Sequence, residues 1–172
     1  MRVFTLFAVT VVAFLIEPLI IEIVPFLGTS APEFGIITII YLAHGVKGSP
    51  ARGAGYSLML GYLMDLYSGA PVGMHAFVYV LLYFMLRLLS TKIYGHTVIA
   101  QAIMGGIFSA LVGLVIISMD KWLNPVPHSW VFLRIIPRQM LVTAVFSPLW
   151  FWILWKLDRL FFYEASPEGV FK

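Results

Sequence analysis

The sequence predicts an all-α integral membrane protein with about six transmembrane helices. Of its 172 residues, 61% are hydrophobic and only 11% are charged, whereas a soluble domain carries about 25% charged residues. A helical span needs about 20 apolar residues, so six spans with short loops use nearly the whole chain. We therefore expect one polytopic membrane domain over residues 1–163, followed by a short cytoplasmic tail over residues 164–172 that is disordered at its end.

The composition also argues against several functional classes. The chain has no cysteine, so a disulfide, a thiol nucleophile or a thiolate metal site cannot form. Its four histidines are widely separated, and the sequence contains no Gly-rich phosphate loop, zinc-protease motif or nucleophile elbow. No basic cluster alternates with aromatic residues, as nucleic-acid binding would favour. We expect no catalytic residue, no cofactor, no bound metal and no nucleic-acid partner.

The first predicted span covers Val3–Val24 and contains two acids. Glu17 precedes Pro18, which removes a backbone donor and is expected to kink the helix. Glu17 is interpreted either as a packing or partner contact or as an acid bonded to nearby hydroxyl groups. For Glu22 the favoured interpretation is an acid at the membrane interface.

The second predicted span, Glu33–Val46, is short and opens with Pro32-Glu33. Proline suits the first helical turn, and an acid there complements the helix dipole. The segment is either a short spanning helix or a broken helix that packs against protein.

The most informative stretch is a hairpin between the predicted spans Gly53–Tyr67 and Val72–Leu89. Residues 68–73 contain Pro71 and two glycines, which predict a tight turn. Small residues in the first of these spans permit close helix pairing in lipid. Three glycines and one acid follow one another at steps of four, the spacing that places residues on one face of a helix: Gly61, Asp65, Gly69 and Gly73.

Asp65 is an acid in a long apolar neighbourhood. A charge at the centre of a membrane helix costs roughly 2.5–3.5 kcal/mol on insertion scales, and less near the interface. One interpretation is a buried contact to a partner helix or partner protein. The other is an interface-level acid that caps the turn or is solvated. His75, which opens the following span, is close enough along the chain to bond Asp65 across the turn.

Two further spans are predicted over Thr97–Ser118 and Gln139–Leu157. The first carries Gly105-Gly106 and Gly113, which indicate another close-packing surface. Pro148 is expected to kink the second. Between them, Met119–Pro137 mixes prolines with tryptophans, which is typical of a loop at the membrane interface.

The distribution of Lys and Arg predicts the orientation. With six spans both chain ends share one side of the membrane. Three basic residues fall on the other side, and eight fall on the side of the termini: Arg2, Lys47, Arg52, Arg87, Lys92, Lys156, Arg159 and Lys172. Positive residues concentrate on the cytoplasmic side, so we expect a multi-pass protein of a bacterial inner membrane with both termini in the cytoplasm.

The hairpin resembles the bacterial rod shape-determining protein MreD family. The resemblance is carried by Pro32-Glu33 before a short span, a basic loop, and the Gly61-x-x-x-Asp65-x-x-x-Gly69-x-x-x-Gly73 pattern before an apolar span. It is best over about residues 32–89. The family's fold is similar to the six-helix substrate-binding subunits of energy-coupling-factor transporters. The resemblance implies partner-binding roles for these residues: Pro32, Glu33, Gly61, Asp65, Gly69 and Gly73. Glu33 is a departure, since Asp is expected there, but the charge is kept.

The resemblance implies a non-catalytic scaffold of the cell-elongation machinery. Family members associate with the bitopic protein MreC and, through it, with the actin-like MreB filament. They also work with a RodA-type glycosyltransferase and a class B penicillin-binding protein in peptidoglycan synthesis. The alternative is a vitamin-type binding subunit of an uptake transporter, for which the outward-side polar candidates are Glu22, Asp65, His75 and His128. A proton-coupled channel or an enzyme ranks last, because only Asp65 and Glu17 support it.

Overall fold

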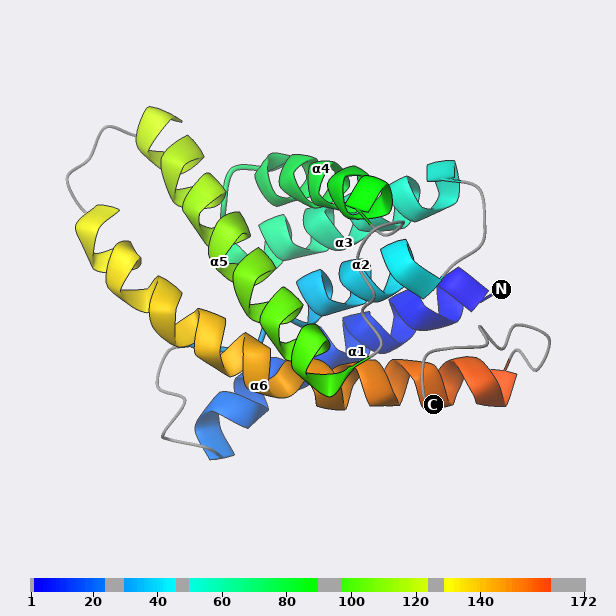
Figure 1. Ribbon diagram of the computed structural model, residues 1–172. Coiled ribbons are helices and arrows are strands. Elements are labelled where there is room, and N and C mark those ends of the chain that lie inside the picture. Colours follow the sequence, from blue (N-terminus) through cyan, green and yellow to red (C-terminus); the bar gives the residue numbers. More distant parts are fainter. Residues whose placement is uncertain (1, 24–29, 46–49, 90–96, 124–128, 162–172) are drawn as a thin grey trace.

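The computed structural model describes residues 2–23, 30–45, 50–89, 97–123 and 129–161. The described residues form helices and no strands, which confirms the all-α prediction. Figure 1 shows the order of the six helices: α1 (Arg2–Ile23), α2 (Phe34–Gly45), α3 (Pro50–Ser68), α4 (Met74–Leu89), α5 (Val98–Leu123) and α6 (Ser129–Phe161). The predicted disordered tail, residues 164–172, lies outside the described residues.

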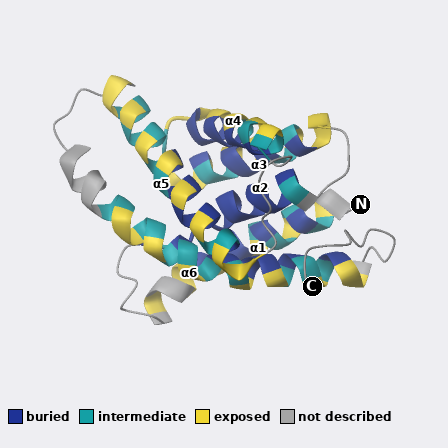
Figure 2. Cartoon of the chain, in the orientation of Figure 1, coloured by how far each residue is buried: buried dark blue, intermediate teal, exposed yellow. Residues whose placement is uncertain are grey.

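The short helix α2 forms the centre of the bundle. It contacts each of the other five helices, and Figure 2 shows it as the most uniformly buried element. Ile36, Ile37 and Ile39 are fully buried. Its 12 residues give a helix of about 18 Å, well short of a hydrocarbon core of about 30 Å. The helix is packed against protein on its sides, and whether it also crosses the membrane stays a prediction.

The other helices include two antiparallel pairs, α3 with α4 and α5 with α6. Glycines allow the close approach of α5 to α6, as the sequence predicts. A Cβ atom at Gly105 would overlap the Ser147 side chain, and one at Gly106 would lie 3.1 Å from the Ala144 Cβ. Figure 1 shows the far ends of α5 and α6 reaching beyond the remaining helices.

The outer faces of the helices are apolar, which suits lipid rather than water. On α6 the exposed residues Leu141, Val145 and Leu149 follow one another at steps of four. On α4, Phe77 and Leu81 form a similar exposed stripe. Monomeric soluble proteins rarely expose contiguous apolar surface of this extent. Lipid-facing helices, in contrast, lose nothing by presenting such residues to hydrocarbon chains.

Two helical segments are long and apolar enough to cross a membrane, Val98–Trp122 in α5 and Ile135–Leu160 in α6. The apolar stretches of α1, α2 and α4 are shorter. The structure thus confirms the predicted helices, whereas six complete membrane crossings remain a prediction.

Hydrogen bonds between side chains tie α2 to the helices around it. The Thr10 and Thr38 hydroxyl oxygens lie 2.9 Å apart, and Trp150 Nε1 donates to Thr38 Oγ1 at 3.0 Å. At the other end of α2, the Tyr41 hydroxyl donates to Asp158 Oδ2 at 3.1 Å. Such bonds hold membrane helices together where hydrophobic association contributes little.

The prediction of an interfacial loop over Met119–Pro137 is wrong for most of that segment. Helix α5 continues to Leu123, and α6 begins at Ser129. Pro137 lies inside α6, where the sequence interpretation treated it as a helix breaker. Neighbouring helices can satisfy the backbone groups that a proline frees in a membrane helix. The other predicted bounds differ from the helices by a few residues: α3 begins at Pro50 instead of Gly53, and α6 ends at Phe161 instead of Leu157.

Candidate functional site

The Asp65 carboxylate caps the first turn of α4. Asp65 is 1% exposed. Its Oδ2 accepts hydrogen bonds from Gly73 N at 2.8 Å and Ala76 N at 3.4 Å, and its Oδ1 accepts one from His75 N at 2.7 Å. The first backbone N–H groups of a helix have no partner within the helix, and a negative charge there complements the helix dipole. Asp65 supplies both the acceptors and the charge from the preceding helix.

The His75 side chain adds a further bond to the same carboxylate. Its Nδ1 lies 2.8 Å from Asp65 Oδ1, which is a hydrogen-bond distance. The ring also makes an edge contact with Tyr79 at a centroid distance of 6.2 Å. The predicted bond between Asp65 and His75 is therefore confirmed, and of the interpretations of Asp65 the structure shows the cap.

The glycines of the hairpin have steric and conformational roles. A Cβ atom at Gly61 would overlap the backbone of Ala76 and approach the His75 carbonyl oxygen to 2.6 Å, so α3 and α4 are in backbone contact there. Gly69 and Gly73 adopt φ angles of 68° and 101°, values that favour glycine. The predicted turn over residues 68–73 is confirmed, since α3 ends at Ser68 and α4 begins at Met74.

Pro32 and Glu33 lie at the start of α2 and are both buried. The Glu33 backbone N–H donates to Thr143 Oγ1 of α6 at 3.3 Å. The Glu33 side chain is 9% exposed, and its Oε2 has no hydrogen-bond partner. Glu33 thus lies directly before α2, as the sequence predicts, and its carboxyl group is inside the bundle.

Tyr79 of α4 contacts both the start of α2 and His75 of the α3–α4 hairpin. A Cβ atom at Gly35 would come within 3.1 Å of the Tyr79 ring and 3.2 Å of its hydroxyl oxygen, so the start of α2 lies against this tyrosine. Tyr79 is 1% exposed and also contacts His75. No spacing in the sequence signals the contact between Tyr79 and the start of α2.

Glu17 also lies in the interior. It is 5% exposed, and its Oε2 has no hydrogen-bond partner. Glu22, five residues later, is exposed. The burial of Glu17 agrees with the interpretation as a packing contact, and a contact with a partner protein stays a prediction.

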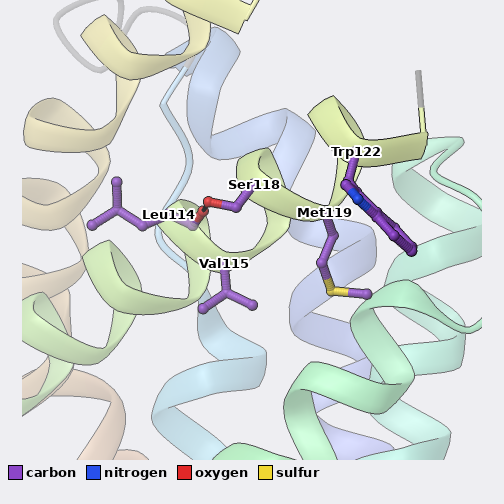
Figure 3. Close-up of a pocket in the computed structure, with 5 residues that line it drawn as sticks. All are labelled: Leu114, Val115, Ser118, Met119 and Trp122. Carbon is purple, nitrogen blue, oxygen red and sulfur yellow. Dashed lines mark hydrogen bonds between the residues drawn. The ribbon is translucent and has the colours of Figure 1, made fainter. Parts of the chain in front are cut away.

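Two pockets on the described surface are lined mainly by apolar side chains. One, of about 220 Å³, lies where α1, α2 and α6 meet and is lined by Val9, Val12, Ala13, Ile16, Phe34 and Trp150. The other, of about 440 Å³, follows the end of α5, with the lining residues shown in Figure 3. Neither lining includes a charged side chain, so these pockets suit apolar groups such as lipid chains or a helix surface.

The vitamin-binding alternative requires polar groups that converge in a pocket. Of its four candidates, Asp65 and His75 are bonded to each other, Glu22 is exposed, and His128 lies outside the described residues. Among the described residues, no group of three or more His, Cys, Asp or Glu side chains could hold a metal ion.

The fold and the hairpin define a helical membrane protein whose conspicuous polar residues stabilise its own architecture. The family comparison agrees with this class. Residues 1–159 match the model of the family described as rod shape-determining protein MreD. The match covers most of the chain, which therefore belongs to the MreD family of bacterial membrane proteins. Searches of curated proteins and of solved structures gave no match, so the likeness to energy-coupling-factor transporter subunits stays a prediction.

Proposed function

We propose that this protein is a non-catalytic membrane scaffold of the bacterial rod-shape machinery. Membership of the MreD family over residues 1–159 is the observation that carries the proposal. The scaffold would bind a bitopic MreC-like partner through that partner's transmembrane helix. Through this partner it would act with an actin-like MreB filament, a RodA-type glycosyltransferase and a class B penicillin-binding protein in peptidoglycan synthesis. It would reside in the inner membrane with both termini in the cytoplasm.

The geometry of the α3–α4 hairpin supports a scaffold. Asp65 fixes the start of α4 through three backbone N–H groups and one imidazole. Backbone contact at Gly61 fixes the separation of the two helices. A rigid hairpin in which no side chain needs to move presents a constant outer surface, and such preorganisation lowers the entropy cost of binding.

The partner-binding residues implied by the family pattern divide into two groups. Gly61 and Asp65 are buried between α3 and α4, so we assign them an indirect role in holding the hairpin. Gly69 and Gly73 lie at the exposed tip, where a Cβ atom would meet nothing within 4 Å, so a partner can approach the backbone there. Pro32 and Glu33 are buried and would act through the placement of α2.

The exposed face of the hairpin offers a surface of the right chemistry for a partner helix. Leu58, Tyr62 and Leu66 are exposed on α3 at steps of four. Gly55 on the same helix has open space around its Cα atom. Small residues beside large apolar ones let membrane helices pack closely. We propose that the partner's helix packs along this face.

Site-specific photocrosslinking tests this assignment. A photoreactive amino acid at Tyr62 should crosslink to the bitopic partner in membranes, whereas the same probe at Val145 on the exposed face of α6 should not. Equal crosslinking at both positions, or none at Tyr62 when the complex co-purifies intact, would exclude the α3 face as the docking surface.

A further inference from the structure

Two buried acids from different segments share the interior of the bundle. Glu17 comes from the second half of α1, and Glu33 immediately precedes α2. They are 5% and 9% exposed, and the two carboxyl groups are near enough to repel each other when both are charged. The hairpin acid, Asp65, differs because its carboxylate has a complete set of donors.

The described part of the chain places no positive charge beside these two carboxyl groups. Among the described residues, no Lys, Arg or His acts on either group. The titratable groups that interact with the pair are Tyr79 from α4 and Tyr67 from α3. His75, which is also on α4, is already bonded to Asp65. From α6, the neutral Thr143 hydroxyl accepts a hydrogen bond from the Glu33 backbone N–H.

Several buried polar atoms of these segments have no hydrogen-bond partner. Ser109 of α5 is 2% exposed, and its Oγ has no hydrogen-bond partner. Glu17 Oε2, Glu33 Oε2 and Ser109 Oγ all lack a partner. Buried polar atoms without protein partners are rare in native structures, and a bound proton, an ordered water or an ion can account for them.

Physical chemistry limits what can fill this site. An isolated carboxylate in a medium of low dielectric is so unfavourable that the group takes up a proton instead. Two like charges in one site cannot both remain, as in acid pairs that share a proton. A metal ion would need several oxygen ligands around it, and no group of three or more His, Cys, Asp or Glu side chains is gathered in the described part of the chain.

We infer that Glu17 and Glu33 form an internal proton-binding site, in which at least one of the two carboxyl groups is a neutral acid in the folded membrane protein. A neutral carboxyl group has an O–H donor as well as an acceptor, so it can bond a hydroxyl or carboxylate oxygen that an ionised carboxylate could only repel or accept from.

Infrared spectroscopy of the full-length protein in lipid nanodiscs at neutral pH tests the inference directly. The wild-type protein should show the carbonyl stretch of a neutral carboxylic acid. The Glu17→Gln/Glu33→Gln double variant should lose that band, and at least one single variant should weaken it. The matched control is Glu22→Gln on the exposed face of α1, which should leave the band unchanged. A band of equal intensity in the double variant would overturn the inference.

Two further measurements keep the test decisive if the double variant does not fold. In wild-type protein made with ¹³C-labelled glutamate, the band should shift, and with ¹³C-labelled aspartate it should not; the opposite pattern overturns the inference. The second measurement follows the unfolding temperature of the wild-type protein and of Glu33→Gln as sodium or potassium is added. The proton site predicts no saturable ion effect that depends on Glu33. A saturable effect lost in Glu33→Gln would identify a metal-ion site instead and overturn the inference.

Discussion

Asp65 Oδ1 receives two hydrogen bonds from His75, one from its backbone N–H at 2.7 Å and one from its ring Nδ1 at 2.8 Å. One residue thus contacts the acid through both its main chain and its side chain. Because Oδ2 holds the Gly73 N–H at 2.8 Å, the carboxylate connects the last turn of α3 to the turn and to the first turn of α4. A single acid thereby fixes the angle and register of the hairpin.

Replacing Asp65 by alanine should destabilise the protein strongly. The change leaves the N–H groups of Gly73 and His75 and the His75 ring in a buried site without their acceptor. An unmade buried hydrogen bond costs about 1–3 kcal/mol, so the loss should exceed that of a single bond. We expect a clearly lower unfolding temperature in detergent. The control is His75→Ala, which removes the ring bond and keeps the backbone bonds, and should cost less. Equal stability of wild type and Asp65→Ala would contradict the capping role.

Replacing Gly61 by alanine should separate α3 from α4. The added Cβ atom meets the backbone of Ala76, which cannot rotate away as a side chain can. Overpacking of this kind typically costs about 1–3 kcal/mol. The matched control is Gly55→Ala on the same helix, where the Cβ atom enters open space and alanine should be neutral or slightly favourable in a helix. Thermal unfolding of the two variants side by side gives the comparison, and similar melting of both would refute the close contact.

Replacing Gly73 by alanine should strain the turn before α4. Its φ angle of 101° is one that alanine adopts at a cost of order 1–3 kcal/mol. The effect should appear as reduced thermal stability although the Cβ atom meets no neighbour. Val72→Ala, at the exposed neighbouring position, controls for changes at the turn surface. If Gly73→Ala unfolds at the same temperature as the wild type, the backbone conformation at this position differs from the one described.

The predictions from sequence succeeded where chemistry and spacing were local. Pro71 and Gly73 indicate the turn within a few residues of Asp65, and His75 is near enough in the chain for its bond to be anticipated. The helices follow from apolar length. In contrast, the burial of Glu17, Glu33 and Ser109 depends on how three distant segments pack, and no periodicity in the sequence records it.

The main error in the helix assignment has a related cause. A proline in a soluble helix removes a hydrogen bond that water or a neighbour must replace, so Pro137 looked like an end of helix. Inside a membrane bundle the neighbours can satisfy the freed carbonyl group, and α6 runs through this position. The structure of the segment is thus set by tertiary surroundings that local propensity does not contain.

Replacing Thr38 by valine should loosen the attachment of α2. The change keeps the shape of the side chain but removes the oxygen that contacts Thr10 Oγ1 at 2.9 Å and Trp150 Nε1 at 3.0 Å. Interhelical hydrogen bonds in membranes contribute roughly 0.6–2 kcal/mol each, and two are lost together. Ser118→Ala is the control, because the exposed Ser118 hydroxyl bonds only a carbonyl of its own helix at 2.7 Å. Unfolding in detergent measures both, and a larger effect of Ser118→Ala would contradict the proposed attachment.

Co-purification of the bitopic partner from bacterial membranes tests the scaffold most directly. In cells that lack the native protein, the wild-type chain should capture the MreC-like partner and restore rod shape. The Asp65→Ala variant should insert into the membrane at a comparable level yet capture clearly less partner. Glu22→Gln should behave as wild type. If full-length Asp65→Ala retains the partner as well as the wild type does, and the cells keep their rod shape, the hairpin is not the element through which this protein acts.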